Sequence, residues 1–257
     1  MRKRADSVIV QSWLHVTAKG DTLPLRNIFA RINPTAAQRV LYITHWDTRP
    51  TADEDPNLGN KRMPILGAND GASGVALLMG IADALKKSPP AYGVDLLFVD
   101  GEDYGDFNTW RDTATAPDVL IGSTYFVNHL PTPDYKPMFG VLWDMIGDRE
   151  LQIFPEGNSV DGAPEVVSRV WQTAAELGYR KYFVNETHGG ITDDHLPFLK
   201  KGIRVVDVID IDYCATGVNC AGDQQRNFHH TMQDTVDKVS AKSLQIVGDV
   251  AVALLTR

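Results

Sequence analysis

The sequence predicts a single α/β domain with a mixed, mostly parallel central sheet and helices on both of its faces. After two apolar runs near the start, strand-like segments alternate with segments whose apolar residues recur at helical spacing. The chain has 257 residues, which suits one large α/β domain, and no shift in composition marks a linker. We therefore expect one domain over residues 1–257.

Apolar runs of strand length set the expected order of the sheet. We expect strands at Val8–Val16, Leu23–Ile32, Val40–Thr44, Val94–Val99, Phe139–Trp143, Leu151–Phe154 and Ile203–Ile209. The first two can pair as a hairpin. We expect helices at Ser73–Lys87, Ser123–Leu130, Ala163–Leu177 and Ala241–Leu255. In the first helix, Val75, Leu78 and Leu85 recur at helical spacing and mark its buried side.

Composition excludes several classes of protein. The hydrophobic share of 43% and the charged share of 23% are those of ordinary globular chains, not of disordered or fibrous ones. A net charge of −8 argues against a nucleic-acid partner, which requires a basic face. No apolar run approaches the roughly 18 residues of a membrane span. The basic start Met1–Arg4 is followed by an apolar run too short for a signal peptide, so we expect a solvated start and leave the compartment open.

The two cysteines, Cys214 and Cys220, are too few for a disulfide framework and do not form a zinc-binding pair. They lie close together in a glycine-containing loop, where a local disulfide is geometrically easy. Two free thiols are an equally good interpretation, so the redox state stays open.

Acidic and imidazole side chains follow several of the predicted strands. These segments are His45–Asp47, Gly67–Gly71, Asp100–Asp103, Asp144–Asp148, Asp193–His195 and His229–His230. A single Asp at a strand end is usually a helix cap, but so many such ends are hard to explain as caps. Clustered carboxylates repel unless a cation neutralises them, and carboxylate with imidazole suits zinc. The pattern therefore indicates a metal-dependent hydrolase or transferase.

The same segments resemble the superfamily that contains zinc aminopeptidases of the bacterial leucyl type and the glutaminyl cyclases. The resemblance runs from about Asn27 to the end of the chain, and its motifs are specific in their order and spacing. They are His45-Trp46-Asp47, Gly67-Ala68-Asn69-Asp70-Gly71-Ala72-Ser73-Gly74, Asp100-Gly101-Glu102-Asp103, Asp144-Met145-Ile146-Gly147, Asp193-Asp194-His195-Leu196-Pro197-Phe198-Leu199 and His230-Thr231-Met232. The resemblance implies a zinc-dependent catalytic domain that acts on the amino terminus of a peptide or protein.

Carried over by position, the resemblance implies that Asp70, Asp103 and His230 hold zinc. Asp103 stands where the family usually has Glu, so its shorter side chain requires a shift of the loop. Glu102 matches the general acid/base. The peptide bond between Asp70 and Gly71 is a candidate cis bond, since a cis bond often follows this Asp in relatives.

Two activities remain open within the superfamily. Cyclases have Asp-Asp-His where peptidases usually have Ser-Asp-His, and the resemblance then implies a proton network of Asp193, Glu102 and Asp144. Cyclases also carry an insert with a pocket tryptophan, near the place of Trp110. Animal cyclases have Trp before the last ligand, where this chain has His229 as a candidate substrate contact.

We expect a glutaminyl-peptide cyclotransferase that converts amino-terminal glutamine to pyroglutamate and releases ammonia, with one zinc ion. The alternative is a metalloaminopeptidase, in which His45 and Asp144 would complete a second metal site and Glu102 would activate water. A homologue without catalytic activity is a third interpretation, and the retention of Glu102 beside the ligand set argues against it.

Overall fold

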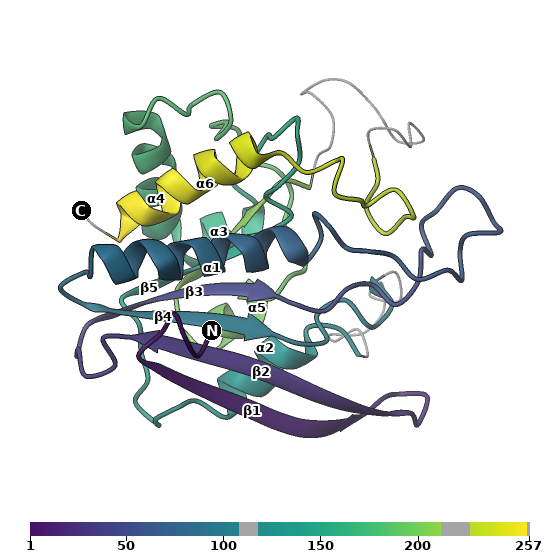
Figure 1. Cartoon of the computed structure of the whole chain (residues 1–257), viewed down its shortest axis with the longest axis horizontal. Helices are drawn as coiled ribbons and strands as arrows, with labels where there is room; N and C mark the ends of the chain where they lie inside the picture. Colours follow the sequence, from purple (N-terminus) through teal and green to yellow (C-terminus); the bar gives the residue numbers. More distant parts are fainter. Residues whose placement is uncertain (108–117, 212–226, 256–257) are drawn as a thin grey trace.

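The computed structural model describes residues 1–107, 118–211 and 227–255. Its centre is a six-stranded sheet with the strand order β1-β2-β4-β3-β5-β6 (Figure 1). The strands are β1 (Ser7–Val16), β2 (Thr22–Ile32), β3 (Arg39–His45), β4 (Gly93–Val99), β5 (Phe139–Asp144) and β6 (Val205–Ile209). The helices are α1 (Ala72–Lys87), α2 (Ile121–Asn128), α3 (Gly157–Gly162), α4 (Pro164–Glu176), α5 (His195–Lys200) and α6 (Ala241–Leu254).

The direction of the strands confirms the predicted sheet. β1 and β2 form the expected antiparallel hairpin, and β2 is also antiparallel to β4. β4, β3, β5 and β6 are parallel to one another. The chain passes from β3 through α1 to β4 on one side of β3, and then through α2 to β5 on the other side. In open α/β sheets, ligands bind beyond the carboxyl ends of the strands where the order reverses in this way.

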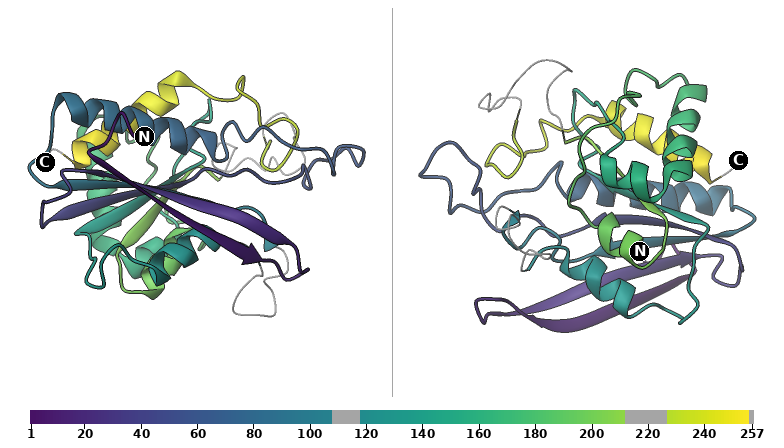
Figure 2. Two further views of the ribbon diagram at one scale, coloured as in Figure 1. Left: turned by 60° about the horizontal axis from the view of Figure 1, so that its bottom comes forward. Right: turned by 180° about the vertical axis from the view of Figure 1, so that it is seen from behind.

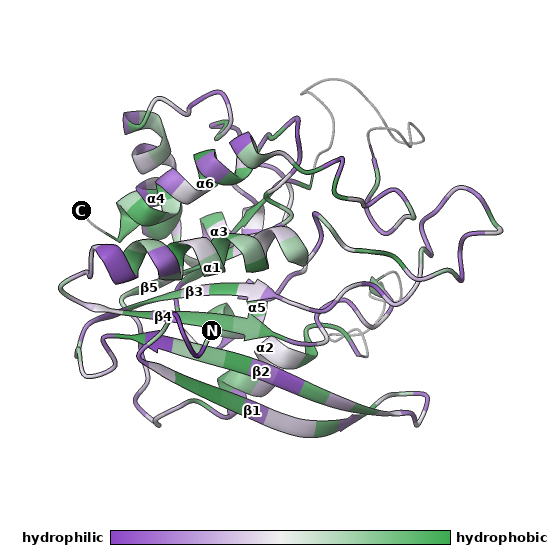
Figure 3. Cartoon of the chain, in the orientation of Figure 1, coloured by the Kyte–Doolittle hydropathy of each residue, from purple (hydrophilic) through white to green (hydrophobic). Residues whose placement is uncertain are grey.

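Helices cover both faces of the sheet, as the alternation of segments predicts. α1, α4 and α6 lie on one face, whereas α2 and α5 lie on the other (Figures 1 and 2). Because successive side chains of a strand point to opposite faces, Tyr42 of β3 packs into the core under α1, while Leu41 and Ile43 pack against α2 and α5. Figure 3 shows β4 as almost wholly hydrophobic, whereas β2 near the edge alternates.

Two features of the predicted element order are wrong. The expected strand Leu151–Phe154 forms only a single bridge, between Ile153 and Phe183, because the segment runs beside a loop and not beside a strand of the sheet. The short helices α3 and α5 were not predicted. Each has 6 residues, which is too short for helical periodicity to stand out in the sequence.

Three residues singled out in the sequence, Trp110, Cys214 and Cys220, lie outside the described residues. The pocket tryptophan and the thiols therefore stay predictions. Within the described ranges, no helix is both long and apolar enough to cross a membrane.

Candidate metal centre

The predicted ligands Asp70, Asp103 and His230 come from three different segments and meet beyond the carboxyl ends of the central strands. Asp70 lies in the turn before α1, Asp103 follows β4, and His230 lies in the loop that precedes α6. One ligand atom of each lies within 4.8 Å of the others. His230 Nε2 is 3.1 Å from Asp103 Oδ1 and 3.3 Å from Asp70 Oδ2, and all three side chains are buried.

The electrostatics of this group favour a bound cation. Burial raises the pKa of Asp103, and the neighbouring charge of Asp70 raises it further. Burial also opposes ionisation of Asp70, but its close contacts with His230 and His45 outweigh burial and hold its pKa well below the ordinary value. Asp70 Oδ2 and Asp103 Oδ2 are buried without a hydrogen-bond partner. The carboxylate and imidazole donors therefore fit a zinc ion, which would satisfy these oxygens.

A second group of possible ligands shares Asp70. His45 Nε2 lies 2.9 Å from Asp144 Oδ1 and 3.1 Å from Asp70 Oδ1, and the three side chains are buried. Burial lowers the pKa of His45, but the charge and hydrogen bond of Asp144 outweigh it, so that the pKa is raised well above its ordinary value. This is the set that a second metal ion would use in the aminopeptidase alternative.

Glu102 lies beside the ligands and belongs to none of the groups of possible metal ligands found in the described residues. Its carboxylate is buried, with Oε2 3.9 Å from His45 Nδ1. Asp47 fixes the backbone here, because its two carboxylate oxygens accept hydrogen bonds from the N–H groups of Glu102 and Asp103. Burial, followed by the charge of Asp103, raises the pKa of Glu102 well above its ordinary value. A carboxyl group with a raised pKa suits proton transfer.

Asp193 brings a further buried carboxylate to the same pocket. Burial raises its pKa, and the charges of Asp144 and Asp194 raise it further. The expected proton network contains both Asp193 and Asp144, but no direct hydrogen bond between them is found among the contacts of the described residues. Asp144 Oδ1 is instead occupied by His45 and by the N–H group of Met145. The two carboxylates interact through their charges.

These side chains line a pocket of about 300 Å³. Its polar lining consists of the three candidate ligands and of Glu102, Asp144 and Asp193. Apolar side chains form other parts of its wall: Phe107, Met145, Ile191, Ile209 and Ile211. His229 lines the pocket, and its ring stacks on that of His230 with centroids 3.6 Å apart; its contact with a substrate stays a prediction.

The expected cis bond between Asp70 and Gly71 is wrong, since no cis bond occurs in the described residues. Gly71 makes the turn with a φ of 90°, which glycine adopts without strain. A Cβ atom at this position would lie 2.6 Å from the carbonyl oxygen of Asp47. The sharp entry into α1 therefore depends on the missing side chain of Gly71.

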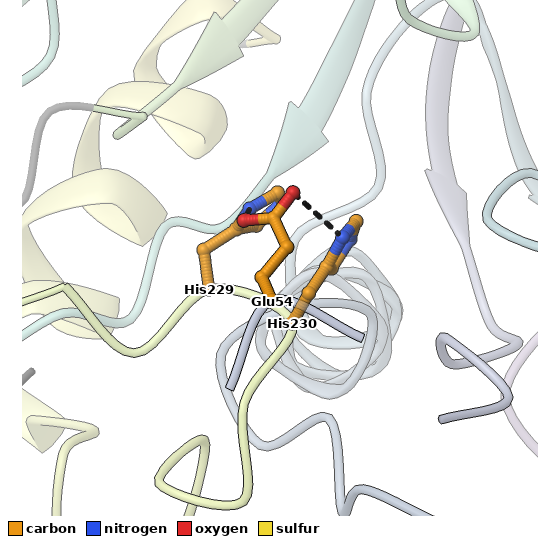
Figure 4. A group of neighbouring side chains, drawn as sticks. All are labelled: Glu54, His229 and His230. Atoms are coloured by element: carbon orange, nitrogen blue, oxygen red, sulfur yellow. Dashed lines mark hydrogen bonds and ion pairs between the residues drawn. The ribbon is translucent and has the colours of Figure 1, made fainter. Parts of the chain in front are cut away.

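Sequence reasoning missed two charged residues in the loop between β3 and α1. Arg49 is buried and donates to the backbone oxygen of Asp103 at 3.0 Å and to that of Gly105. Glu54 contacts both His229 and His230 (Figure 4). The sequence of this loop carries no pattern that shows which of its residues reach the candidate ligands.

A buried polar cluster lies behind the pocket. His195 at the start of α5 has Nε2 3.2 Å from Glu156 Oε1 and Nδ1 3.9 Å from Asp207 Oδ2. Asp207 in β6 and Asp210 just after this strand are both fully buried. Burial, and then the charge of Asp193, raises the pKa of Asp207 well above its ordinary value.

A comparison with known protein families identifies the family of this chain. The model of peptidase family M28 matches residues 27–255, which is most of the chain. The chain belongs to peptidase family M28.

Individual relatives include both cyclases and peptidases. The chain is 27% identical to the glutaminyl-peptide cyclotransferase of Bos taurus, over 93% of this chain and 70% of that protein. It is 26% identical to aminopeptidase YwaD of Bacillus subtilis, over 83% of this chain but 40% of that protein. A solved glutaminyl cyclase of Bacteroides thetaiotaomicron, bound to N-acetylhistamine, is 33% identical with a TM-score of 0.89, and the match covers 99% of this chain and 85% of that one.

Proposed function

We propose that the chain is a zinc-dependent glutaminyl-peptide cyclotransferase, which converts the amino-terminal glutamine of a peptide to pyroglutamate and releases ammonia. Asp193 carries this proposal. A third acidic group beside Glu102 and Asp144 suits a reaction that moves a proton from one nitrogen to another. In a hydrolase, where Glu102 alone would deprotonate the attacking water molecule, this additional carboxyl group has no evident role.

Asp70, Asp103 and His230 would hold the zinc ion. When bound, zinc supplies Lewis acidity toward the side-chain carbonyl group of the substrate glutamine.

Glu102 does the proton work in this proposal. It accepts a proton from the α-amino group as the amine nitrogen forms a bond to the side-chain carbonyl carbon. It then donates a proton to the departing nitrogen as the carbon–nitrogen bond of the carboxamide breaks. No water is consumed, and ammonia is the second product. The raised pKa of Glu102 suits both steps, because the same group must accept and return a proton.

The wall of the pocket favours ring closure over hydrolysis. Phe107, Ile191 and Ile209 are apolar and line the same pocket as the carboxylates. Apolar surface around the reacting groups keeps competing water away from the carbonyl. It also confines a short side chain next to its own α-amine, which raises the effective concentration of the attacking nitrogen.

The related structures support the same activity. The Bacteroides thetaiotaomicron cyclase binds N-acetylhistamine, whose imidazole is a common type of zinc ligand. We therefore expect N-acetylhistamine to compete with glutaminyl peptides in this chain.

A metalloaminopeptidase is the second candidate, and one observation favours it. His45, Asp70 and Asp144 form a further buried group of possible ligands that shares Asp70 with the first. In that function Glu102 would deprotonate a water molecule, which would attack the first peptide bond. The relatives also include aminopeptidase YwaD and a structure from Parabacteroides distasonis, 32% identical, that is described as a Zn-dependent exopeptidase.

The two candidates separate in one paired assay. The zinc-loaded chain is incubated with a glutaminyl peptide and, in parallel, with a leucyl anilide. We expect ammonia from the first and no cleavage of the second, with loss of activity after chelation of zinc. Cleavage of the anilide without release of ammonia would replace the cyclotransferase with the aminopeptidase.

A further inference from the structure

Glu54 joins two neighbouring imidazoles at the mouth of the pocket. Its Oε2 lies 3.2 Å from Nδ1 of His229, and its Oε1 lies 3.5 Å from Nδ1 of His230 (Figure 4). The backbone N–H of Glu54 also donates to the carbonyl oxygen of His230 at 3.3 Å. One residue of the β3–α1 loop thus contacts both the side chain and the main chain of a candidate ligand.

The two nitrogens of His230 face different surroundings. Nε2 points to Asp70 and Asp103, whereas Nδ1 is buried without a hydrogen-bond partner. An imidazole that binds metal through Nε2 carries its proton on Nδ1, and that proton needs an acceptor. In the described part of the chain, Glu54 is the residue that forms an ion pair with Nδ1.

The backbone of His230 needs external support. Its φ of 50° lies in the left-handed region, which is unfavourable for a residue with a side chain. The loop that carries Glu54 is itself anchored to the same segment, because Asp55 Oδ2 accepts a hydrogen bond of 3.0 Å from the N–H of Met232. Lys61 ties the other part of this loop to the carbonyl oxygen of Asp53 at 2.7 Å.

We propose that Glu54 is the positioning residue of the metal centre. It accepts the Nδ1 proton of His230, fixes the tautomer that presents Nε2 to the metal, and holds the ring of His229 against that of His230. This inference rests on the metal centre proposed above, and Glu54 acts through His230 without touching the substrate.

Zinc affinity is the direct test. Dissociation constants are measured on the full chain by competition with a chromophoric chelator, for the wild type, Glu54→Gln and Glu54→Ala. Loss of a carboxylate that orients a histidine ligand weakens metal binding by about 10- to 100-fold, which we expect for Glu54→Ala. Glu54→Gln keeps an acceptor oxygen, so its zinc affinity should lie between that of the wild type and that of Glu54→Ala. Glu186, an exposed loop glutamate, supplies the matched controls Glu186→Gln and Glu186→Ala, which should bind as the wild type does.

A second readout reports the tautomer itself. In zinc-loaded wild type, nitrogen-15 NMR should show His230 with its proton on Nδ1, and the signal of that proton should shift in Glu54→Gln. A merely structural role would lower thermal stability without moving this signal or the zinc affinity. Because Glu54→Gln has almost the same shape as the original residue, it keeps the test valid if Glu54→Ala does not fold.

The outcomes separate the inference from the function beneath it. A wild type that binds no zinc overturns the metal centre, and this inference with it. Equal zinc affinity in the wild type and the folded Glu54 variants overturns the inference alone. Loss of one of two bound zinc ions, with the tighter site unchanged, also overturns it, because Glu54 would then be a ligand and not a positioning residue.

Discussion

Glu102 and Asp103 are neighbours in sequence, yet they face different tasks in the site. Asp103 points to His230 and Asp70, where a cation would lie between them. Glu102 stays outside that group and has its carboxylate near His45. The backbone contacts of Asp47 to both N–H groups hold the two side chains in this division.

This division predicts a clean separation of binding from catalysis. Glu102→Gln should keep the zinc content of the wild type, because the replaced group is not a ligand and its volume hardly changes. Turnover of a glutaminyl peptide should fall by about 10²–10⁴-fold, the usual contribution of general acid–base catalysis. Zinc analysis and steady-state rates check both parts. A near-normal rate would remove Glu102 from the proton-transfer role.

At the scale of elements, α1 sets the place of Asp70 through its close approach to the sheet. A Cβ atom on Gly74 would lie 2.1 Å from Thr44 Oγ1 of β3 and 2.5 Å from the carbonyl oxygen of Trp143 of β5. Gly80, on the exposed side of the same helix, has nothing within 4 Å. Gly74 is therefore required for the close packing of α1 on the sheet, whereas packing does not require a glycine at position 80.

Alanine at these positions should change the free energy of unfolding in opposite directions. Gly74→Ala should lower it by about 1–3 kcal/mol, because the helix must move away from β3 and β5. Gly80→Ala should raise it by about 1 kcal/mol, because alanine favours the helix more than glycine does. Urea denaturation measures both changes. Zinc affinity should also fall in Gly74→Ala, since α1 begins at Ala72, two residues after Asp70. Equal changes in the free energy of unfolding for the two variants would contradict these opposite effects.

Glu156 connects α3 to the segment that precedes α5. Its carboxylate caps α3 by accepting from the N–H groups of Asn158 and Ser159, and it also accepts from the N–H of Ile191. Burial raises its pKa, but the contacts with His195 and with these N–H groups outweigh burial and hold the pKa at about 2. The capped helix and the segment before α5 are thereby joined by one charged group.

A carboxyl pKa that is lower in the folded chain gives a defined pH dependence. The stabilisation is fully present above the ordinary value of 4.5 and is lost as the pH falls from there toward about 2. Glu156→Gln should therefore lower the free energy of unfolding by about 1.5–3 kcal/mol at pH 7, the range for hydrogen bonds to charged groups. The difference in the free energy of unfolding between the wild type and Glu156→Gln should shrink below pH 4.5. Denaturation experiments at several pH values measure this difference. A difference that stays constant across this range would show that the charge of Glu156 does not contribute to stability.

At the scale of the whole molecule, the sequence predicts a mostly parallel sheet. Because parallel strands end at the same edge of a sheet, it also predicts that the acidic residues after these strands lie close together. Asp70 and Asp103 stand out in the sequence because one precedes α1 and the other follows β4, whereas the choice of Asp70, Asp103 and His230 as the ligand set rests on the family resemblance.

Glu54 could not be predicted, since its partner His229 is 175 positions away and only the folded loops join them. The apolar run at Leu151–Phe154 looked like a strand, but its bridge partner Phe183 belongs to a loop that carries no strand pattern.

The number of metal ions is also a property of the whole site. We predict one zinc per chain in the wild type and a sharp loss of zinc in Asp103→Ala, because that variant removes one of the three donors. Metal analysis of the purified chain measures both. Two zinc ions per wild-type chain would favour the aminopeptidase, and full occupancy in Asp103→Ala would remove Asp103 from the ligand set.

The central claim is that the substrate's own amine, and not water, attacks the carbonyl. Mass spectrometry of a single peptide with amino-terminal glutamine tests it directly after incubation with the zinc-loaded chain. The account predicts that the peptide keeps all its residues and loses only the mass of one ammonia, with no free glutamine in the mixture. Free glutamine, together with a peptide shorter by its first residue, would contradict it.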